Sequence, residues 1–254
     1  MSSAPPDPSL DVAVLPDYEA LSRSAAERVA AYVRAALATQ DTFALALAGG
    51  STPRGLYERL ARASLPWDRI HLYWGDERVV PHDHPKSNVR LVRETLLDGL
   101  DLPAPNVHPM PTTGAPDDAA AAYADTLQRA FADRAHTFDL ALLGMGEDGH
   151  TASLFPEHEP SPSDPRWVRA VSAPPRHDIA RRLTCTLPVF NQARRALVLV
   201  SGASKRDTVR AALQERDATL PITHVHPQDR LVWLLDEAAA PPEAAENDDR
   251  PHSA

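Results

Sequence analysis

The segment FDLALLGMGEDGHTASLFP, residues 138–156, joins an apolar run to a glycine-rich turn that carries two acids and a histidine. The apolar part is short and continuous and ends at a glycine, which is typical of a buried strand. Glu147, Asp148 and His150 follow within the turn. A neutral imidazole at a strand end can take a proton from water, and a neighbouring acid can orient it. The segment therefore predicts a catalytic histidine beside an orienting acid, with a structural histidine bonded to a nearby carbonyl as the alternative.

Apolar runs and helical patterns alternate along the rest of the chain. The predicted strands are 42–50, 70–80, 138–146, 196–202 and 230–236. The predicted helices are 17–39, 51–61, 87–100, 117–133 and 204–216. Strands that are continuous apolar runs and alternate with helices indicate a mostly parallel sheet with helices on both faces. The sequence therefore predicts a Rossmann-like α/β fold.

The composition limits both the size and the partners of the molecule. Its 254 residues are 43% hydrophobic, enough for a sizeable core, and carry a formal net charge of -9. That balance argues against a nucleic-acid binder, whose surface would be basic. It still allows a small anionic ligand, because local cations can outweigh the global charge. We also expect no membrane partner, since no apolar run approaches the roughly 18 residues that span a bilayer.

The ends of the chain differ in composition from the rest. Residues 1–9 are rich in proline and serine, and residues 239–254 are acidic and poor in large apolar groups. We therefore expect one α/β domain over 10–238, with disordered tails on either side. The N-terminus lacks the basic start and apolar stretch of a signal peptide, so we expect a cytoplasmic protein. Cys185, the only cysteine, lies in a strand-like run and is expected to be a buried small hydrophobe.

Four of the predicted strands end in segments with unusual chemistry: AGGSTP, WGDER, GMGEDGH and SGASK. Ligands of parallel α/β sheets bind beyond the carboxyl ends of the strands. We therefore expect the four segments to meet at one edge of the sheet and to form the walls of a site. The G-x-G-x-x-G within GMGEDG does not indicate a dinucleotide, because it lies past the middle of the chain and no smooth helix follows.

Two of these segments, AGGSTP and SGASK, are suited to binding an anion, and WGDER carries two acids and a cation. Gly50, Ser51 and Thr52 lie where backbone N–H groups can point outward at the start of a helix, although a simple capped turn is the alternative. Lys205 lies in the first turn of a helix and suits a phosphate, unless it is merely solvated. In WGDER, adjacent side chains diverge, so Asp76 and Arg78 face the site and Glu77 faces away, or the reverse; a salt-bridged turn is the simpler reading.

Two histidines, His82 and His84, suggest a metal site at first sight. No convincing third ligand and no cysteine cluster accompanies them. We therefore expect them not to be catalytic metal ligands, and we expect no metal and no cofactor.

Taken together, these segments resemble the 6-phosphogluconolactonase family, hydrolytic enzymes of the oxidative pentose phosphate pathway. The resemblance runs from about residue 43 to 240 through LALAGGSTP, WGDERVVPHDHPKSN, FDLALLGMGEDGHTASLFP, RRLTCTLPVFNQAR, LVSGASK and VWLLDEAAA. GGSTP and SGxxK are shared with the glucosamine-6-phosphate deaminases, whereas HTASLFP and the Asp-Glu-Arg turn favour the lactonases. The resemblance implies an α/β fold like that of the deaminases and the ribose-phosphate isomerases.

The resemblance also implies a reaction, the hydrolysis of 6-phospho-D-glucono-1,5-lactone to 6-phosphogluconate. His150 would be the general base that activates water, with Asp148 as its helper. Arg78, Arg182 and Lys205 would hold the substrate's phosphate or its polar end. Arg182 is chosen over its neighbour because the family pattern places the arginine just before an apolar residue and a threonine.

The remaining site residues implied by the resemblance are Gly50, Ser51 and Thr52 in the anion-binding loop, with Asp76 and Asn88 beside the substrate. A δ-lactone is an activated ester, so this reaction needs neither a metal nor a redox cofactor. The alternatives are a glucosamine-6-phosphate deaminase and a non-catalytic sugar-phosphate sensor. We expect a small-molecule partner only and a monomer, with a dimer as the alternative.

Overall fold

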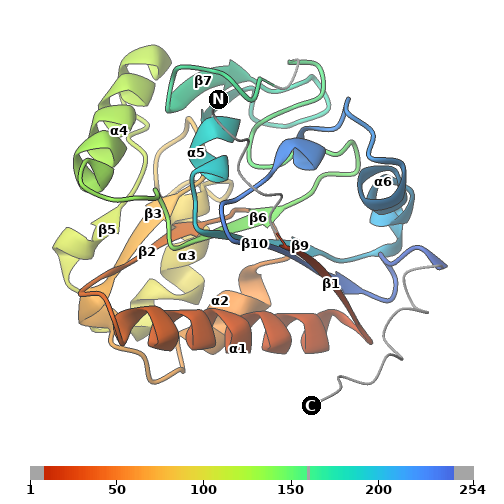
Figure 1. Ribbon diagram of the computed structural model, residues 1–254. Coiled ribbons are helices and arrows are strands. Elements are labelled where there is room, and N and C mark those ends of the chain that lie inside the picture. Colours follow the sequence, from red (N-terminus) through yellow and green to blue (C-terminus); the bar gives the residue numbers. More distant parts are fainter. Residues whose placement is uncertain (1–8, 159–160, 243–254) are drawn as a thin grey trace, which may run out of the picture.

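The computed structural model describes residues 9–158 and 161–242. Seven strands form one sheet in the order β1-β10-β9-β6-β2-β3-β5, and all its neighbouring strands run parallel (Figure 1). These strands are β1 (Ser9–Leu15), β2 (Phe43–Leu47), β3 (Ile70–Trp74), β5 (Val107–His108), β6 (Leu140–Gly144), β9 (Arg195–Val200) and β10 (Arg230–Asp236). A smaller antiparallel sheet contains β4 (Asp76–Arg78), β8 (Arg181–Cys185) and β7 (Val168–Ser172), in that order.

Helices cover both faces of the large sheet. Figure 1 shows α1 (Tyr18–Leu37) and α2 (Arg54–Leu60) below the sheet, and α4 (Pro116–Phe131) and α5 (Leu187–Asn191) above it. The other two α-helices of the described residues are α3 (Asn88–Thr95), which packs against α2, and α6 (Arg206–Arg210). The predicted α/β fold with a mostly parallel, doubly covered sheet is therefore confirmed.

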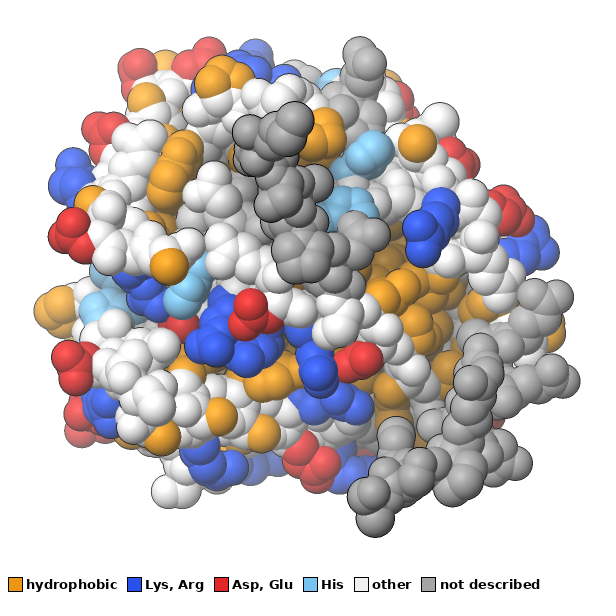
Figure 2. Space-filling model, viewed as in Figure 1, with side chains coloured by type: hydrophobic (Ala, Val, Ile, Leu, Met, Phe, Trp, Pro, Cys, Tyr) orange, Lys and Arg blue, Asp and Glu red, His pale blue; other side chains and the backbone are white. Residues whose placement is uncertain are grey.

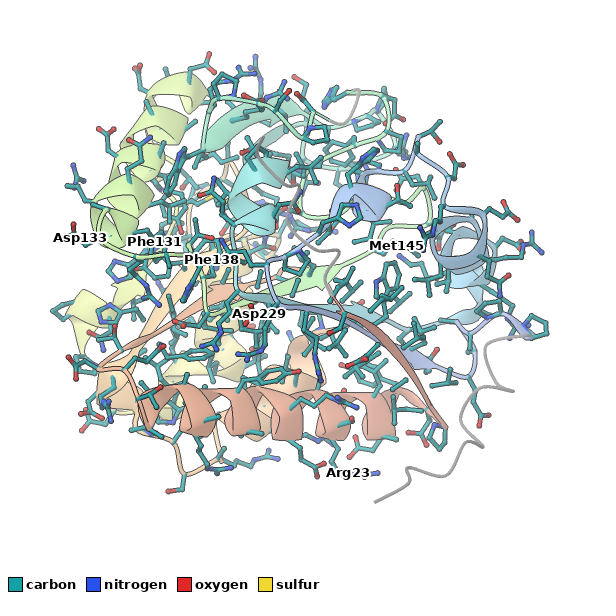
Figure 3. All side chains as sticks on the ribbon, viewed as in Figure 1. Arg23, Phe131, Asp133, Phe138, Met145 and Asp229 are labelled. Carbon is teal, nitrogen blue, oxygen red and sulfur yellow. The ribbon has the colours of Figure 1, made fainter. Side chains whose placement is uncertain are left out.

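The longest helix shows how the sequence selects these elements. Asp17 accepts a hydrogen bond from the N–H of Ala20 at 2.7 Å and so caps the first turn of α1. Its predicted inner face, with Leu21, Val29 and Val33 at helical spacing, is buried against the sheet. On the other face, Phe131 of α4 packs edge-on against Phe138, just before β6, with ring centroids 5.2 Å apart (Figure 3).

A single glycine, Gly75, joins β3 of the large sheet to β4 of the small one. The sequence predicted one strand over 70–80 that runs into a charged turn, but β3 ends at Trp74 and the charged residues form β4 of the small sheet. Gly75 donates its N–H to the carbonyl of Leu47 in β2 and accepts at its own carbonyl from the N–H of Cys185 in β8. One residue therefore joins both hydrogen-bond ladders, and this fixes β4 beside the carboxyl edge of the large sheet.

Other local predictions were wrong or incomplete. Ser51 and Thr52 do not cap α2, which follows Pro53 without a side-chain cap because Gly50 turns the chain with a φ of 89°. The helix predicted over 204–216 is divided into a 3₁₀ turn, the short α6 and a π-helical turn, Ala211–Glu215. The strand β1 was not anticipated, although its register with β10 is continuous from end to end.

The ends of the predicted domain lie close to the ends of the described chain. Residues 1–8 and 243–254, most of the two predicted tails, lie outside the described residues. Ser9 is part of β1 and Ala239 is fully buried, so these two positions belong to the fold. None of the described helices combines the length and the apolar character needed to cross a membrane. Cys185 is buried, as predicted.

An apolar groove remains open beside the edge strand β1. Its lining includes Leu10, Ile222, Leu231 and Trp233, and Figure 2 shows hydrophobic side chains gathered in a hollow between β1 and α6. This groove shares no lining residue with the cavity at the carboxyl edge of the sheet.

The order of the strands places a ligand site at one point of the sheet. From β2 the chain adds β3 and β5 on one side, and it then returns to add β6, β9 and β10 on the other. The direction of strand addition therefore reverses between β2 and β6. In open α/β sheets, ligands bind in the crevice outside the carboxyl ends of the strands at such a switch point. The segments after these two strands are AGGSTP and GMGEDGH.

Candidate active site

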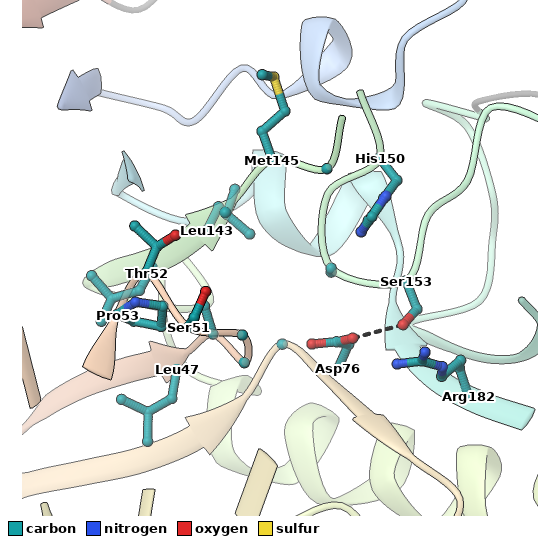
Figure 4. A pocket seen from close by; sticks show the side chains of 18 of the residues that line it. Leu47, Ser51, Thr52, Pro53, Asp76, Leu143, Met145, His150, Ser153 and Arg182 are labelled. Atoms are coloured by element: carbon teal, nitrogen blue, oxygen red, sulfur yellow. Dashed lines mark hydrogen bonds between the residues drawn. The ribbon is translucent and has the colours of Figure 1, made fainter. Parts of the chain in front are cut away.

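A cavity opens at this switch point, and all four predicted strand-end segments line it (Figure 4). From these segments the lining residues are Ala48, Gly49, Gly50, Ser51, Thr52, Pro53, Gly75, Asp76, Arg78, Gly144, Met145, Gly146, His150 and Lys205. Strand β8 of the small sheet adds Arg182, and the loop between β7 and β8 adds His177. The prediction that the four segments meet at one edge of the sheet is therefore confirmed.

His150 points into the cavity (Figure 4), and its ring is held from behind by Asp148. The Nδ1 atom of His150 lies 2.5 Å from Oδ1 of Asp148, and the backbone N–H of His150 donates to the same oxygen at 3.2 Å. Burial alone would raise the pKa of Asp148, but its hydrogen bond and charge interaction with His150, together with Arg176, hold that pKa well below the usual range. Asp148 is therefore a carboxylate at neutral pH, which can only accept, so Nδ1 carries the proton, and Nε2 is the nitrogen with the lone pair whenever the ring is neutral.

Glycines make the turn that presents His150. The N–H of Gly146 donates to the carbonyl of His150 at 2.8 Å, and the N–H of Gly149 donates to the carbonyl of Gly146 at 3.1 Å. A Cβ atom on Gly146 would lie 2.0 Å from Nδ1 of His150, so only glycine fits beneath the ring. Gly149 has a φ of 80°, which side chains rarely adopt. The close approach of the backbone to the imidazole therefore explains the glycines at positions 146 and 149 of GMGEDGH.

Three cations line the cavity: Arg78, Arg182 and Lys205. Each donates to a backbone carbonyl, at 2.6 Å for Arg78 to Lys86, 2.9 Å for Arg182 to Ile179 and 2.6 Å for Lys205 to Met145. Within the described part of the chain, no carboxylate lies within 4.0 Å of their charged nitrogens. Their positive charge therefore faces the cavity without an internal counter-ion.

The environment of two of these cations disfavours their positive charge. Burial lowers the pKa of Arg182, and the neighbouring Arg78 lowers it further, despite opposing contributions from nearby acids. Burial likewise lowers the pKa of Lys205. An anion in the cavity would relieve both effects, because it would supply the missing opposite charge.

The two acids of WGDER have different positions. Asp76 lines the cavity, where it accepts from Ser153 Oγ at 2.6 Å and from the side-chain amide of Asn88 at 3.1 Å. Glu77 is completely buried and faces away, where it accepts from the N–H groups of Asn88 and Val89 at the start of α3. The sequence left two orientations of this turn open. The structure has the first, in which Asp76 and Arg78 face the site and Glu77 faces away. Asn88 is buried behind Asp76 and does not itself line the cavity.

The loop of Gly50, Ser51 and Thr52 forms the wall opposite His150 (Figure 4). Its conformation is set by the positive φ of Gly50 and by Tyr18, whose hydroxyl donates to the carbonyl of Ser51 at 3.3 Å. Among the described residues, no hydrogen-bond acceptor is paired with the N–H groups of these three loop residues. Such free N–H groups, close to a helix start, suit an anion.

Sequence reasoning missed two residues of the loop between β7 and β8. Arg176 forms ion pairs with Asp148 and with Glu157, and the ring of His177 packs edge-on against that of His150 with centroids 5.3 Å apart. No motif marked them, because Pro174 and Pro175 predict only a loop. Their role depends on a fold that brings residue 176 next to residue 148.

The predicted histidine pair is engaged elsewhere. His82 Nε2 bonds to the carbonyl of Met110, and His84 Nδ1 accepts from the N–H of Lys86. A different group of potential metal ligands, Asp148, His150 and His177, has its ligand atoms within 4.8 Å of one another. Nδ1 of His150 and Oδ1 of Asp148 are bonded to each other, and Oδ2 of Asp148 accepts from Arg176, so these three atoms already have partners within the chain. The absence of a metal stays a prediction.

The fold and the site define an α/β protein with a histidine–aspartate pair in a cationic cavity at the switch point of its sheet. Residues 16–233 match the family of glucosamine-6-phosphate isomerases/6-phosphogluconolactonases, and the chain belongs to this enzyme family. It is 42% identical to a 6-phosphogluconolactonase of Synechocystis sp. over 91% of this chain and 97% of that protein. It is 36% identical to one of Mycobacterium tuberculosis, over 91% and 98%.

Solved structures agree with the sequence comparisons. The crystal structure of 6-phosphogluconolactonase from Thermotoga maritima superposes with a TM-score of 0.81 at 31% identity, covering 90% of this chain and all of that one. The predicted resemblance to the 6-phosphogluconolactonases and the prediction of an enzyme are confirmed.

Proposed function

We propose that this chain hydrolyses 6-phospho-D-glucono-1,5-lactone to 6-phosphogluconate, in the oxidative pentose phosphate pathway. The relatives from Synechocystis and Thermotoga maritima bear the name of this activity. The observation that carries the proposal is the pairing of one oriented imidazole with three cations that lack a carboxylate partner among the described residues. A base at one end and positive charge around the cavity match an ester that carries a phosphate.

The chemistry needs one base. Nε2 of His150 takes a proton from water, and the resulting hydroxide adds to the lactone carbonyl to give a tetrahedral oxyanion. The ring C–O bond then breaks, the ring oxygen leaves with the proton from His150, and the carboxylic acid product ionises. Asp148 keeps the proton on Nδ1 and stabilises the imidazolium that forms in between. Water, lactone and product balance without any metal or electron carrier.

The cations anchor the substrate. Arg78, Arg182 and Lys205 bind the phosphate dianion or the polar end of the sugar, and this places the carbonyl near His150. The N–H groups of Gly50, Ser51 and Thr52 add hydrogen-bond donors for the same anion. Several charge-assisted contacts on a small flexible molecule convert binding energy into orientation of the reacting carbonyl.

Asp76 and Asn88 have supporting roles in this proposal. Asp76 accepts a hydrogen bond from a sugar hydroxyl, in addition to the bonds from Ser153 and Asn88 that fix its carboxylate. Asn88 acts through Asp76, because it is buried behind it. We further propose that residues 10–238 act as one domain, in the cytoplasm, as a monomer whose only partner is this small substrate.

The test is proton release after addition of freshly made 6-phosphogluconolactone, with the spontaneous hydrolysis rate subtracted. We expect release well above that background. Ammonia release from glucosamine 6-phosphate without lactone hydrolysis would instead establish a deaminase. Tight binding of 6-phosphogluconate without any rate enhancement would establish a sugar-phosphate sensor.

A further inference from the structure

We infer that Arg176 is a positioning residue that holds Asp148, and through it the imidazole of His150, in the orientation that leaves Nε2 free for water. This inference rests on the function proposed above. Arg176 belongs to the loop between β7 and β8, 28 residues beyond Asp148 in the sequence, yet its guanidinium forms an ion pair with that carboxylate.

The two oxygens of Asp148 have separate tasks. Oδ1 accepts two hydrogen bonds from His150, one from Nδ1 of the ring and one from the backbone N–H. Oδ2 accepts from Nη2 of Arg176. Among the described residues these are the only hydrogen-bond partners of the Asp148 side chain, so Arg176 alone fixes the second oxygen. Without it, the carboxylate could rotate about its Cβ–Cγ bond and would no longer select one position of the His150 proton.

Arg176 is itself held in place at its other end. Nη1 donates to Oε1 of Glu157 at 2.5 Å, so the guanidinium bridges two acids. The loop that carries it is closed at its base by a bond from the N–H of Ala173 to the carbonyl of Ala180, at 2.6 Å. The next residue, His177, packs its ring edge-on against His150, with centroids 5.3 Å apart. One loop therefore restrains the catalytic turn through both a charge and a ring.

The alternative is that Arg176 binds substrate directly. Two observations oppose it: both terminal nitrogens of Arg176 are bonded to carboxylates, and Arg176 is not among the residues that line the cavity. The three cavity cations differ on both points. Arg176 also lines a small adjoining hollow with Arg78 and Arg182, so the experiment has to separate positioning from substrate binding.

The experiment is a double-mutant cycle in the full chain. Arg176→Ala should lower kcat about 10- to 100-fold, the usual effect of losing a group that orients a functional side chain, with KM changed less than about twofold. The kcat of Arg176→Lys should lie between those of the wild type and Arg176→Ala. In an Asp148→Asn background, Arg176→Ala should have no further effect, because the carboxylate it holds is gone. The matched control is Arg210→Ala, since Arg210 is an exposed arginine that also pairs with two acids, Asp207 and Glu215, and lines no part of the cavity.

A second measurement does not depend on turnover. In the ligand-free protein, the proton on Nδ1 of His150 should give a far-downfield NMR signal that Arg210→Ala leaves intact and Arg176→Ala broadens or removes. The inference is overturned if Arg176→Ala leaves both the NMR signal and kcat unchanged. An equal fall of kcat on Arg176→Ala in the Asp148→Asn background and in the wild type would overturn it as well. It is also overturned if Arg176→Ala raises KM for the phosphorylated lactone alone, which would make Arg176 a substrate ligand. A wild-type protein that shows the signal but hydrolyses no lactone would refute the proposed function and leave the positioning role standing.

Discussion

Replacing Arg182 with methionine should separate substrate binding from stability in this protein. The guanidinium is buried, with 7% of the residue exposed, and its bond within the described chain is a single donation to the carbonyl of Ile179. Methionine keeps an unbranched apolar stem like that of arginine but ends before the guanidinium, so the charge and the donors are removed. The variant therefore removes the cation and little else.

The size of the effect follows from these contacts. A hydrogen bond to a charged group contributes about 1.5–3 kcal/mol, and each 1.36 kcal/mol is tenfold, so kcat/KM for the phosphorylated lactone should fall about 10- to 150-fold. The stability of the free protein should stay the same or rise, because burial and the like charge of Arg78 both disfavour the protonated guanidinium.

The assay compares 6-phosphogluconolactone with plain gluconolactone, each corrected for spontaneous opening, and thermal unfolding with and without inorganic phosphate. Arg181→Met is the matched control, because Arg181 is the preceding residue of β8 but is exposed and outside the cavity. The wild type and the control should prefer the phosphorylated lactone and melt higher with phosphate. Arg182→Met should lose most of both. A variant that keeps the full preference, or melts much lower than the control, would refute the reasoning.

Three further predictions concern the base, metals and pH. His150→Asn should stay folded and still bind 6-phosphogluconate, while the rate in the proton-release assay falls about 10²- to 10⁴-fold; near-wild-type kcat would move the role to Asp148 or Asp76. Treatment with EDTA should leave activity unchanged, and loss that Zn²⁺ restores would contradict the prediction that His82 and His84 are not catalytic ligands. Burial alone would raise the pKa of Asp139, but bonds from His136, Ala44 and Gln40 and the charge of Arg134 lower it from 3.8 to about 2. Asp139 should therefore contribute about 2 kcal/mol above about pH 4, and this contribution should vanish as the pH falls through 2. In urea unfolding at pH 7, Asp139→Asn should be less stable than wild type, and the difference should shrink towards pH 2; a constant difference would contradict the assignment.

The sequence predicted the site better than it predicted the connections around it. Glycines and charged residues directly after apolar runs are local signals, and parallel sheets bring the carboxyl ends of strands together, so the four segments that line the cavity could be found in advance. The division at Gly75 could not, because it depends on pairing with β8, more than 100 residues later in the chain. The same holds for Arg176, whose partners lie on other loops.

The assignments within each segment depended on different information. That Arg182 rather than Arg181 faces the cavity came from a family pattern, and the structure explains it by the alternation of side chains along β8. Asn88 was placed beside the substrate by the same pattern, but it is buried behind Asp76. A motif can therefore mark a residue that acts on a neighbour as strongly as one that lines the cavity, and only packing distinguishes the two.

The positive charge of the cavity also depends on where the nearby acids are bonded. Glu77 follows Asp76 and precedes Arg78 in the sequence, yet its carboxylate accepts from backbone N–H groups at the start of α3 and from the hydroxyl of Ser87, and it forms no ion pair with Arg78. Asp76 is likewise occupied by Ser153 and Asn88. Neutral donors thus satisfy these acids and leave the cavity cations without a carboxylate partner among the described residues. In a chain with a net charge of -9, this arrangement of hydrogen bonds lets a few cations present a positive surface to the proposed anionic substrate.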